Sequence, residues 1–247
     1  LFILNCLVGF SQSKSIDLNP KDTTVHLQPY GLRAGIDLSR LARSLYDKDY
    51  TGLEFVGDYR LSQNLYVAAE LGNEKNTQQE DWYNYTTSDS YVKLGIDLNV
   101  YDNWYGMNNS IYIGGRYAFS TFKHKLNNYQ IFDSNRYWNP EDNIQGTTDF
   151  GEFSGLNASW LEFVTGIKVE LFSNLYLGAS VRLSFLVSDK EDENFANLWI
   201  PGFNKTTEGS RFGVGYNYSL SYMIPLYKKK KKKKDAETEE EDNQPEN

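Results

Sequence analysis

FGVGYNYSLSYMIPLY, residues 212–227, is the stretch that decides the fold. Large apolar and aromatic side chains occupy every second position from Phe212 to Ile224, and small or polar residues and one methionine stand between them. A period of two over this length is typical of a strand with lipid on one side and a polar interior on the other, since a membrane-spanning strand needs about 9 to 11 residues. We expect this strand to close a β-barrel through Tyr216, Tyr218, Leu220, Tyr222 and Tyr227.

The composition favours the same class of protein. The 247 residues include 19 tyrosines and 14 phenylalanines, which suit strands and the membrane interface. The sequence has no run of about 18 apolar residues, which excludes a helical membrane protein. With a net charge of −8, it also lacks the basic character of a nucleic-acid-binding protein. We therefore expect outer-membrane lipid as a partner, and no nucleic acid.

The two ends of the chain differ from the middle. Residues 1–11 are apolar and are interpreted as the remnant of a signal peptide, whose removal takes away Cys6, the only cysteine. A lipoprotein anchor at Cys6 would need a small residue before it, where the chain has asparagine. Residues 12–30 predict a periplasmic lead-in to a barrel over residues 31–227. Residues 228–247 open with seven lysines and continue with acidic residues, which predicts a disordered tail.

Eight segments have the alternation of a half-buried strand, which predicts an all-β fold with a single antiparallel transmembrane β-barrel of the outer-membrane type. They are residues 31–39, 51–61, 65–72, 90–100, 110–120, 159–171, 175–186 and 212–227.

The connections between these segments alternate in length. Short polar turns follow the second, fourth and sixth segments, and longer polar stretches follow the others. Outer-membrane barrels have short periplasmic turns and long outer loops, so we expect both termini in the periplasm. A β-sandwich with Greek-key crossings has no reason to alternate in this way.

Three of the long connections are expected to be irregular: residues 73–89, 121–158 and 187–209. The second leaves room for one extra hairpin, which would make ten strands. After the first segment, Leu41 and Leu45 allow either a helical turn or a longer strand.

The inward positions of the predicted strands carry charges of both signs. An eight-stranded barrel has an interior just wide enough for its own side chains, and an unpaired buried charge is costly, so we expect a paired network that fills the lumen. The alternative is a path for protons or ions. The predicted network consists of Arg33, Asp37, Glu54, Asp58, Arg60, Glu70, Lys93, Asp97, Arg116, Glu162, Lys168, Glu170 and Arg182.

Residues for catalysis or metal binding are few. His124, just after the fifth segment, has Ser120 and Thr121 nearby and is the candidate base of a lipid-modifying enzyme. A loop histidine among lysines is more often simply solvated. Acidic clusters, such as Glu80 with Asp81, match no calcium loop, so we expect neither a metal nor a cofactor.

Several stretches resemble a known family. They are residues 31–39, GDYRL at 57–61, YDNWYGMNNSIYIGGRYAFSTF at 101–122, IPGFN at 200–204 and GVGYNYSLSYMIPLYKK at 213–229. Together they are similar to an uncharacterised family of outer-membrane β-barrels, a domain of unknown function, from the Bacteroidota. The resemblance implies a barrel in the outer membrane and brings no catalytic residue or ligand.

The leading hypothesis is a small, closed, non-catalytic barrel with a structural or accessory role in a larger outer-membrane assembly, with other outer-membrane or periplasmic proteins as partners. The alternatives are a lipid-modifying enzyme around His124 and a channel for small solutes.

Overall fold

The computed structural model describes residues 27–81, 83–101, 108–132, 143–145, 150–192, 196–206 and 210–230. The predicted signal-peptide remnant, the lead-in up to residue 26 and the tail from residue 231 lie outside the described residues.

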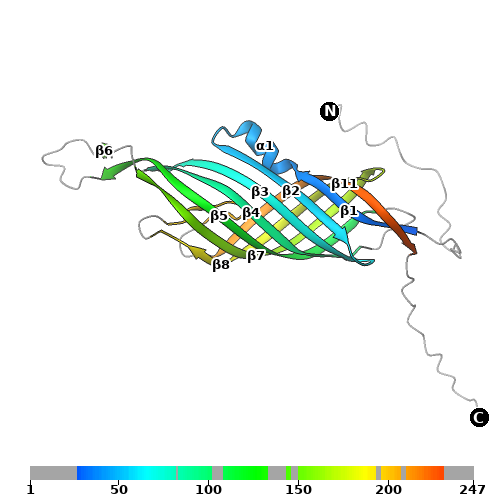
Figure 1. Ribbon diagram of the computed structural model, residues 1–247. Helices are drawn as coiled ribbons and strands as arrows, with labels where there is room; N and C mark the ends of the chain where they lie inside the picture. Colours follow the sequence, from blue (N-terminus) through cyan, green and yellow to red (C-terminus); the bar gives the residue numbers. More distant parts are fainter. Residues whose placement is uncertain are drawn as a thin grey trace, which may run out of the picture.

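Eight long strands of the described chain form an antiparallel ring (Figure 1). Each pairs with the next long strand along the chain, and the pairing of the first with the last closes the ring. The prediction of an eight-stranded barrel is confirmed, because the short β6 (Asn143–Gln145) pairs with β5 and adds nothing to the wall. The wall strands are β1 (Leu27–Asp37), β2 (Tyr50–Arg60), β3 (Leu65–Gln79), β4 (Tyr83–Asn99), β5 (Ser110–Phe132), β7 (Phe150–Phe172), β8 (Leu175–Lys190) and β11 (Phe212–Lys230).

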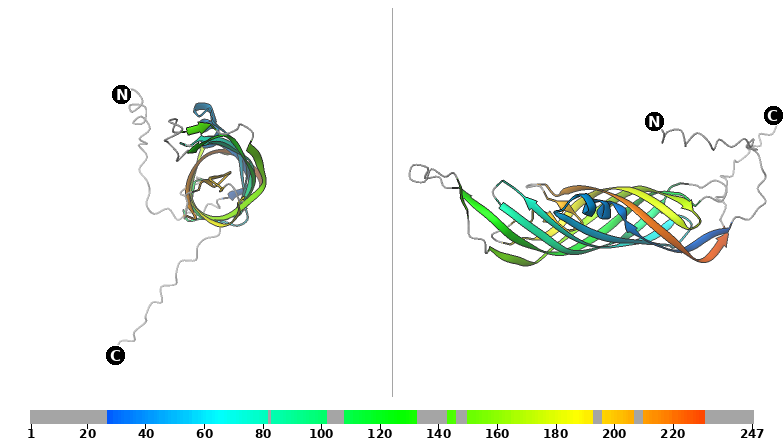
Figure 2. Two further views of the ribbon diagram at one scale, coloured as in Figure 1. Left: turned by 90° about the vertical axis from the view of Figure 1, so that its left-hand side faces the viewer. Right: turned by 90° about the horizontal axis from the view of Figure 1, so that it is seen from above.

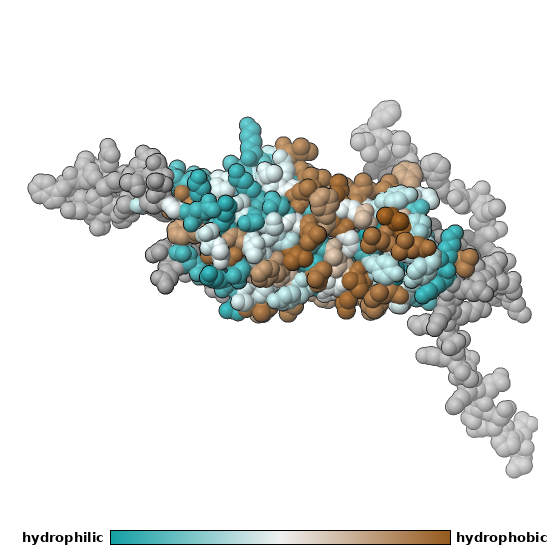
Figure 3. Space-filling model, in the orientation of Figure 1, coloured by the Kyte–Doolittle hydropathy of each residue, from teal (hydrophilic) through white to brown (hydrophobic). Residues whose placement is uncertain are grey.

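The outer face of the ring carries an apolar band that gives way to polar residues toward the end of the barrel away from Leu27 and Lys230, on the left in Figure 3. We call this end the upper end. Leu71, Val92 and Phe119 are register neighbours on β3, β4 and β5 and belong to the band. Two residues further along β3, Asn73 pairs with Ser90, and the outward positions beyond them are polar. An apolar belt bounded by polar residues is the outer surface of a transmembrane barrel. Among the described residues, no helix is long and apolar enough to cross a bilayer.

Beyond the band the strands continue where loops were predicted. β3 and β4 extend to Gln79 and Tyr83, so most of the predicted loop 73–89 is a hairpin arm. β5 and β7 similarly occupy both ends of the predicted loop 121–158, and β8 runs on to Lys190. These extensions were missed because their outward residues are polar, which removes the apolar alternation while the backbone ladder persists.

The two ends of the barrel also differ slightly from the prediction. β1 begins at Leu27 rather than at residue 31, and β11 ends at Lys230 rather than at residue 227. Leu27 and Lys230 are register partners, so both ends of the described chain lie at the same end of the barrel.

A helix follows the first strand. β1 ends at Asp37 instead of residue 39, and the helix α1 (Leu38–Tyr46) begins there. The Asp37 carboxylate accepts a hydrogen bond from the Ser39 amide at 2.7 Å, which is an N-cap. Leu38, Leu41 and Leu45 repeat at helical spacing, so the helical turn left open by the sequence is the one that forms.

A short hairpin lies inside the ring. It consists of β9 (Trp199–Ile200) and β10 (Asn204–Lys205), in the connection between β8 and β11 (Figure 2, left). Ile200 and Phe203 are buried against Trp160 and Tyr91 of the wall. We call residues 199–205 the plug hairpin.

Candidate functional site

The interior of the barrel is the candidate site, and its charged side chains form layers along the barrel axis. In the layer nearest the chain ends, Asp58 of β2 accepts from Arg33 Nε at 2.6 Å and from Lys168 Nζ at 2.5 Å. The Arg33 guanidinium also lies over the rings of Tyr66 and Tyr176. Two cations therefore share one buried carboxylate, and the aromatic faces balance part of the excess positive charge.

The middle layer joins opposite walls of the barrel. Arg182 of β8 reaches Glu70 of β3 at 2.5 Å, and these residues are 112 positions apart in sequence. Arg116 lies 3.5 Å from Glu70 and 2.7 Å from Asp97. All four side chains are buried, so this layer closes the lumen with side chains that are largely paired.

Glu162 of β7 links the middle layer to the layer above. Its carboxylate accepts from Lys93 at 2.8 Å, from Arg182 at 3.3 Å and from the Trp160 indole N–H at 2.7 Å. Lys93 also donates to the backbone carbonyl of Gly202 at 3.1 Å. The plug hairpin is thus bound by the same lysine that neutralises the wall carboxylate.

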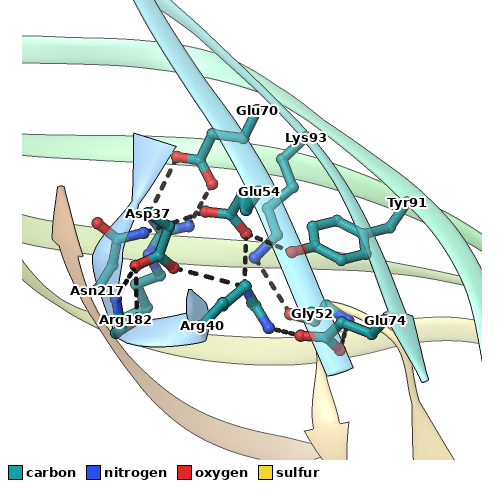
Figure 4. Close-up of polar contacts among 12 residues, drawn as sticks. Asp37, Arg40, Gly52, Glu54, Glu70, Glu74, Tyr91, Lys93, Arg182 and Asn217 are labelled. Carbon is teal, nitrogen blue, oxygen red and sulfur yellow. Dashed lines mark hydrogen bonds and ion pairs between the residues drawn. The ribbon is translucent and has the colours of Figure 1, made fainter. Parts of the chain in front are cut away.

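The third layer is built around Arg40 of α1 (Figure 4). Its guanidinium is ion-paired with Glu54 of β2 at 3.0 Å and with Glu74 of β3. Glu54 also accepts from the Tyr91 hydroxyl and from Asn217 Nδ2, and both glutamates are fully buried. One cation from the helix therefore compensates two carboxylates of the wall.

Eleven of the thirteen predicted lumen residues belong to these ion pairs. Asp37 caps α1 and lies 3.5 Å from Arg40. Arg60 and Glu170 take other partners. Arg60 donates to the backbone carbonyls of Gln63 and Pro29, and Glu170 accepts from the side chain of Asn108 and the backbone of Asn174.

Two members of the network were missed in the sequence. Glu74 follows Glu70 by four residues and so keeps its inward parity, but it falls in the stretch expected to be a loop. Arg40 lies opposite the leucines of α1, so a helical interpretation would have turned it inward. In both cases the sequence contained the charged residue at an inward position, but the stretch around it was not assigned to the strand or helix that it forms.

His124 is buried rather than solvated, which corrects the expectation of an exposed loop histidine. It lies on β5 above the apolar band, 2.6 Å from the Thr87 hydroxyl and 3.3 Å from Asn197 Oδ1. An amide oxygen only accepts, so Nε2 donates to Asn197 and Nδ1 accepts from Thr87. Burial lowers the pKa of His124 to about 4, opposed by the hydrogen bond to Asn197.

Hydroxyl, imidazole and amide are the groups of a nucleophile, a base and an orienting residue. Thr87 and His124 are fully buried and Asn197 nearly so, and the strands β4 and β5 and the loop before the plug hairpin cover them. No substrate reaches the hydroxyl in this arrangement. The three side chains instead tie that loop to the wall.

The remaining interior space is small. Three cavities along the lumen have volumes of about 20, 30 and 20 Å³, each room for roughly one water molecule. Within the described part of the chain, no group of three or more histidine, cysteine, aspartate or glutamate side chains could hold a metal ion. The arrangement suits a filled core rather than a channel or a reaction chamber.

Comparison with known proteins gave three results. The family model described as Domain of unknown function (DUF6048) matches residues 1–229. The crystal structure of Neisserial surface protein A (NspA) is similar to this chain with a TM-score of 0.40 and 9% sequence identity, over 81% of this chain and 99% of that one. Similarity at this level supports no statement about function. A search of curated proteins found no match.

Proposed function

The chain belongs to the DUF6048 family, a domain of unknown function, and we propose that it is a small, closed, non-catalytic barrel of the outer membrane with a structural or accessory role in a larger assembly. The occupied interior is the observation that carries this proposal. Buried ion pairs join opposite walls, and the plug hairpin lies above them.

The apolar band supports the location in a membrane. Leu94, Phe163 and Val181 are each about half exposed at the middle of the outer face, where water would make such exposure costly. A ring of antiparallel strands is the form in which strands cross a bilayer, because pairing satisfies their backbone groups. In this ring the pairing is continuous except beside α1. The origin in the Bacteroidota and the periplasmic position of both termini stay predictions.

The absence of catalysis is part of the proposal. His124 is the candidate base, but its neutral imidazole already bonds on both nitrogens to Thr87 and Asn197 inside the wall. A hydrolase needs its nucleophile within reach of the substrate. We expect His124→Ala to leave the lipid mass spectrum of the cells unchanged. A changed lipid profile that tracks this substitution would favour the enzymatic alternative instead.

Co-purification tests the accessory role. The tagged full-length chain is extracted in mild detergent, with and without prior crosslinking in cells, and its companions are identified by mass spectrometry. We expect one or a few membrane or periplasmic proteins to recur in stoichiometric amounts. The matched control is an unrelated eight-stranded barrel expressed at the same level. A protein that always elutes alone and crosslinks to nothing above this control contradicts the proposal.

A further inference from the structure

The barrel wall has one place where strand pairing is interrupted. β1 leaves the ladder at Asp37, so its last partners are Ser219 of β11 and, through Ile36, Phe55 of β2. Beyond this point, residues 50–54 of β2 pair with β3 and residues 212–218 of β11 pair with β8, and no described strand lies between these two edges.

The helix α1 lies over this gap, in contact with β2 and β11 (Figure 2, right). The outward neighbours on β11 are Val214 and Tyr216, which are exposed members of the apolar band. On β2 the outward neighbour is the exposed Leu53, which pairs with Asn73 at the limit of the band. The interruption therefore adjoins the lipid layer on its β11 side and reaches the limit of the band on its β2 side. In α1 itself, Leu45 is 89% exposed and Tyr46 is 72% exposed on the outer side, while Arg40 points inward.

Side chains alone hold the helix in place. Of the backbone-to-backbone hydrogen bonds of the described chain, none joins α1 to β2 or to β11. The contacts across the gap include the ion pairs of Arg40, the Gly52 backbone N–H donating to the Ser44 hydroxyl at 2.9 Å, and Arg43 stacked over the rings of Tyr50 and Trp199. A wall strand could leave only by breaking a full ladder, whereas α1 can leave by breaking these few contacts.

We propose that α1 is a lateral gate in the barrel wall and that Arg40 is its latch. Behind the helix lies a cavity of about 20 Å³ whose lining includes Arg40, Lys93, Gly202, Gly215 and Asn217. Outward movement of α1 joins this cavity to the lipid layer. The gate stays shut because withdrawing Arg40 leaves Glu54 and Glu74 buried without a cation, which is strongly unfavourable.

A cysteine behind the helix reports opening. A Cβ at Gly215 would meet nothing closer than 3.8 Å, so Gly215→Cys fits the closed state. In the full-length chain with Cys6→Ser, reconstituted in phosphatidylcholine vesicles, this thiol is exposed to an alkyl maleimide that partitions into the bilayer. We expect slow labelling with Arg40 present, and labelling about tenfold faster or more with Arg40→Ala, the factor that loss of charged hydrogen bonds gives.

The matched control is Ser110→Cys, a buried inward position at the chain-end side of β5. β5 pairs with β4 and β7, and neither of these strands borders the gap. Its labelling should not respond to Arg40→Ala. An unchanged rate at Gly215→Cys overturns the proposal, and so does an equal increase at both positions, because that means a general loosening of the barrel.

A conservative variant covers a failure of Arg40→Ala to fold. Arg40→Lys keeps a positive charge between the two glutamates, but an ammonium lacks the planar fork that spans both. We expect it to give a smaller increase at Gly215→Cys and none at Ser110→Cys. If Arg40→Lys shows no increase while Arg40→Ala cannot be recovered folded, the latch is rejected.

Discussion

At the level of single residues, the interior depends on charges that have no access to water. Lys93 and Glu162 are both about 1% exposed, and their 2.8 Å contact is flanked by Arg182 and Trp160. Lys123 and Glu152 make a contact of the same length on the outer surface, where both side chains are more than 40% exposed. The chain thus contains two lysine–glutamate pairs with equal geometry and opposite solvation.

We expect Lys93→Met to lower the free energy of unfolding by about 3 kcal/mol or more, because it leaves a buried carboxylate without its nearest cation. Lys123→Met should leave it nearly unchanged, since exposed pairs are screened by solvent. Urea unfolding in detergent micelles, followed by tryptophan fluorescence, measures both. Adding Glu162→Gln to Lys93→Met should recover part of the loss. Equal effects of the two lysine substitutions would contradict this account.

His124 makes the outer part of the barrel sensitive to acid. Its folded pKa of about 4 lies below the ordinary value of 6.5 because the imidazolium would be desolvated. The unfolded chain therefore binds a proton that the folded chain does not as the pH falls from about 6.5 to about 4, and stability decreases over that window. Above pH 6.5 this contribution does not change, and the full loss is about 3 kcal/mol.

His124→Gln should remove that sensitivity, since an amide keeps hydrogen-bonding groups near Thr87 and Asn197 but does not titrate in this range. The measurement is the difference in urea midpoint between pH 7 and pH 5 for each protein. We expect a smaller difference in the variant than in the parent. The carboxylates titrate alike in both proteins, so a difference that is the same in the two would show that His124 does not carry the effect.

At the level of elements, the plug hairpin depends on a glycine. Gly202 has φ +83°, and a Cβ there would lie 2.6 Å from the ring of Tyr91. The Tyr91 hydroxyl is bonded to Glu54, so the ring is not free to swing away. Gly155 of β7 has a similar φ of +72°, but a Cβ there would have no atom within 4 Å, which makes it a control for backbone strain alone.

We expect Gly155→Ala to cost about 1 kcal/mol, the strain of a left-handed residue, and Gly202→Ala to cost clearly more because a clash is added. Displacement of the hairpin should also expose the buried indole of Trp199 to water. The measurement is acrylamide quenching of tryptophan fluorescence in the folded, detergent-solubilised protein. Similar quenching for both variants would mean that the contact with Tyr91 does not hold the hairpin.

The elements also show where sequence reasoning succeeds and where it stops. A lipid-facing strand alternates because its two sides meet different solvents, so the eight crossings could be predicted. The arms of β3 and β4 beyond Asn73 have polar residues on the outside, and no pattern separated them from loops. In the connection before β11, IPGFN at 200–204 is a mainly apolar stretch between polar residues. This stretch is the sequence feature that indicates a buried segment where the plug hairpin lies.

The candidate site was predictable to a lesser degree. Alternation within each strand predicts which charges face inward, but it does not assign their partners. Arg182 meets Glu70 across 112 residues because of the stagger between strands around the whole ring, which local patterns do not encode. The inward position of Arg40 could be predicted only if the residues after Asp37 were assigned to a helix, and the short sequence of α1 was compatible with either a helix or a strand.

At the level of the whole molecule, the plug hairpin and the layers of ion pairs both close the barrel along its axis. The plug hairpin fills the upper lumen with Ile200 and Phe203, and the layer of Arg182, Glu70 and Arg116 crosses the lumen below it. A conducting pore needs both to be absent, since the three cavities along the lumen are about 30 Å³ or smaller. A closed barrel is therefore expected to show no conductance even when the hairpin is removed, whereas a channel gated by the hairpin alone would conduct.

We expect the full-length protein to give no single-channel conductance in planar bilayers. Replacing residues 197–206 by a short glycine–serine linker should also give no conductance, because the ion pairs still block the lumen. Separating those ion pairs would leave buried charges unpaired, which is strongly unfavourable. Adding Arg182→Ser and Glu70→Ser together removes the central pair without leaving either charge behind. We expect this variant to be silent as well, because the layers around Asp58 and Arg40 still cross the lumen. Steps of conductance in the unmodified protein, or in the hairpin deletion alone, would instead favour a solute channel with the hairpin as its only gate.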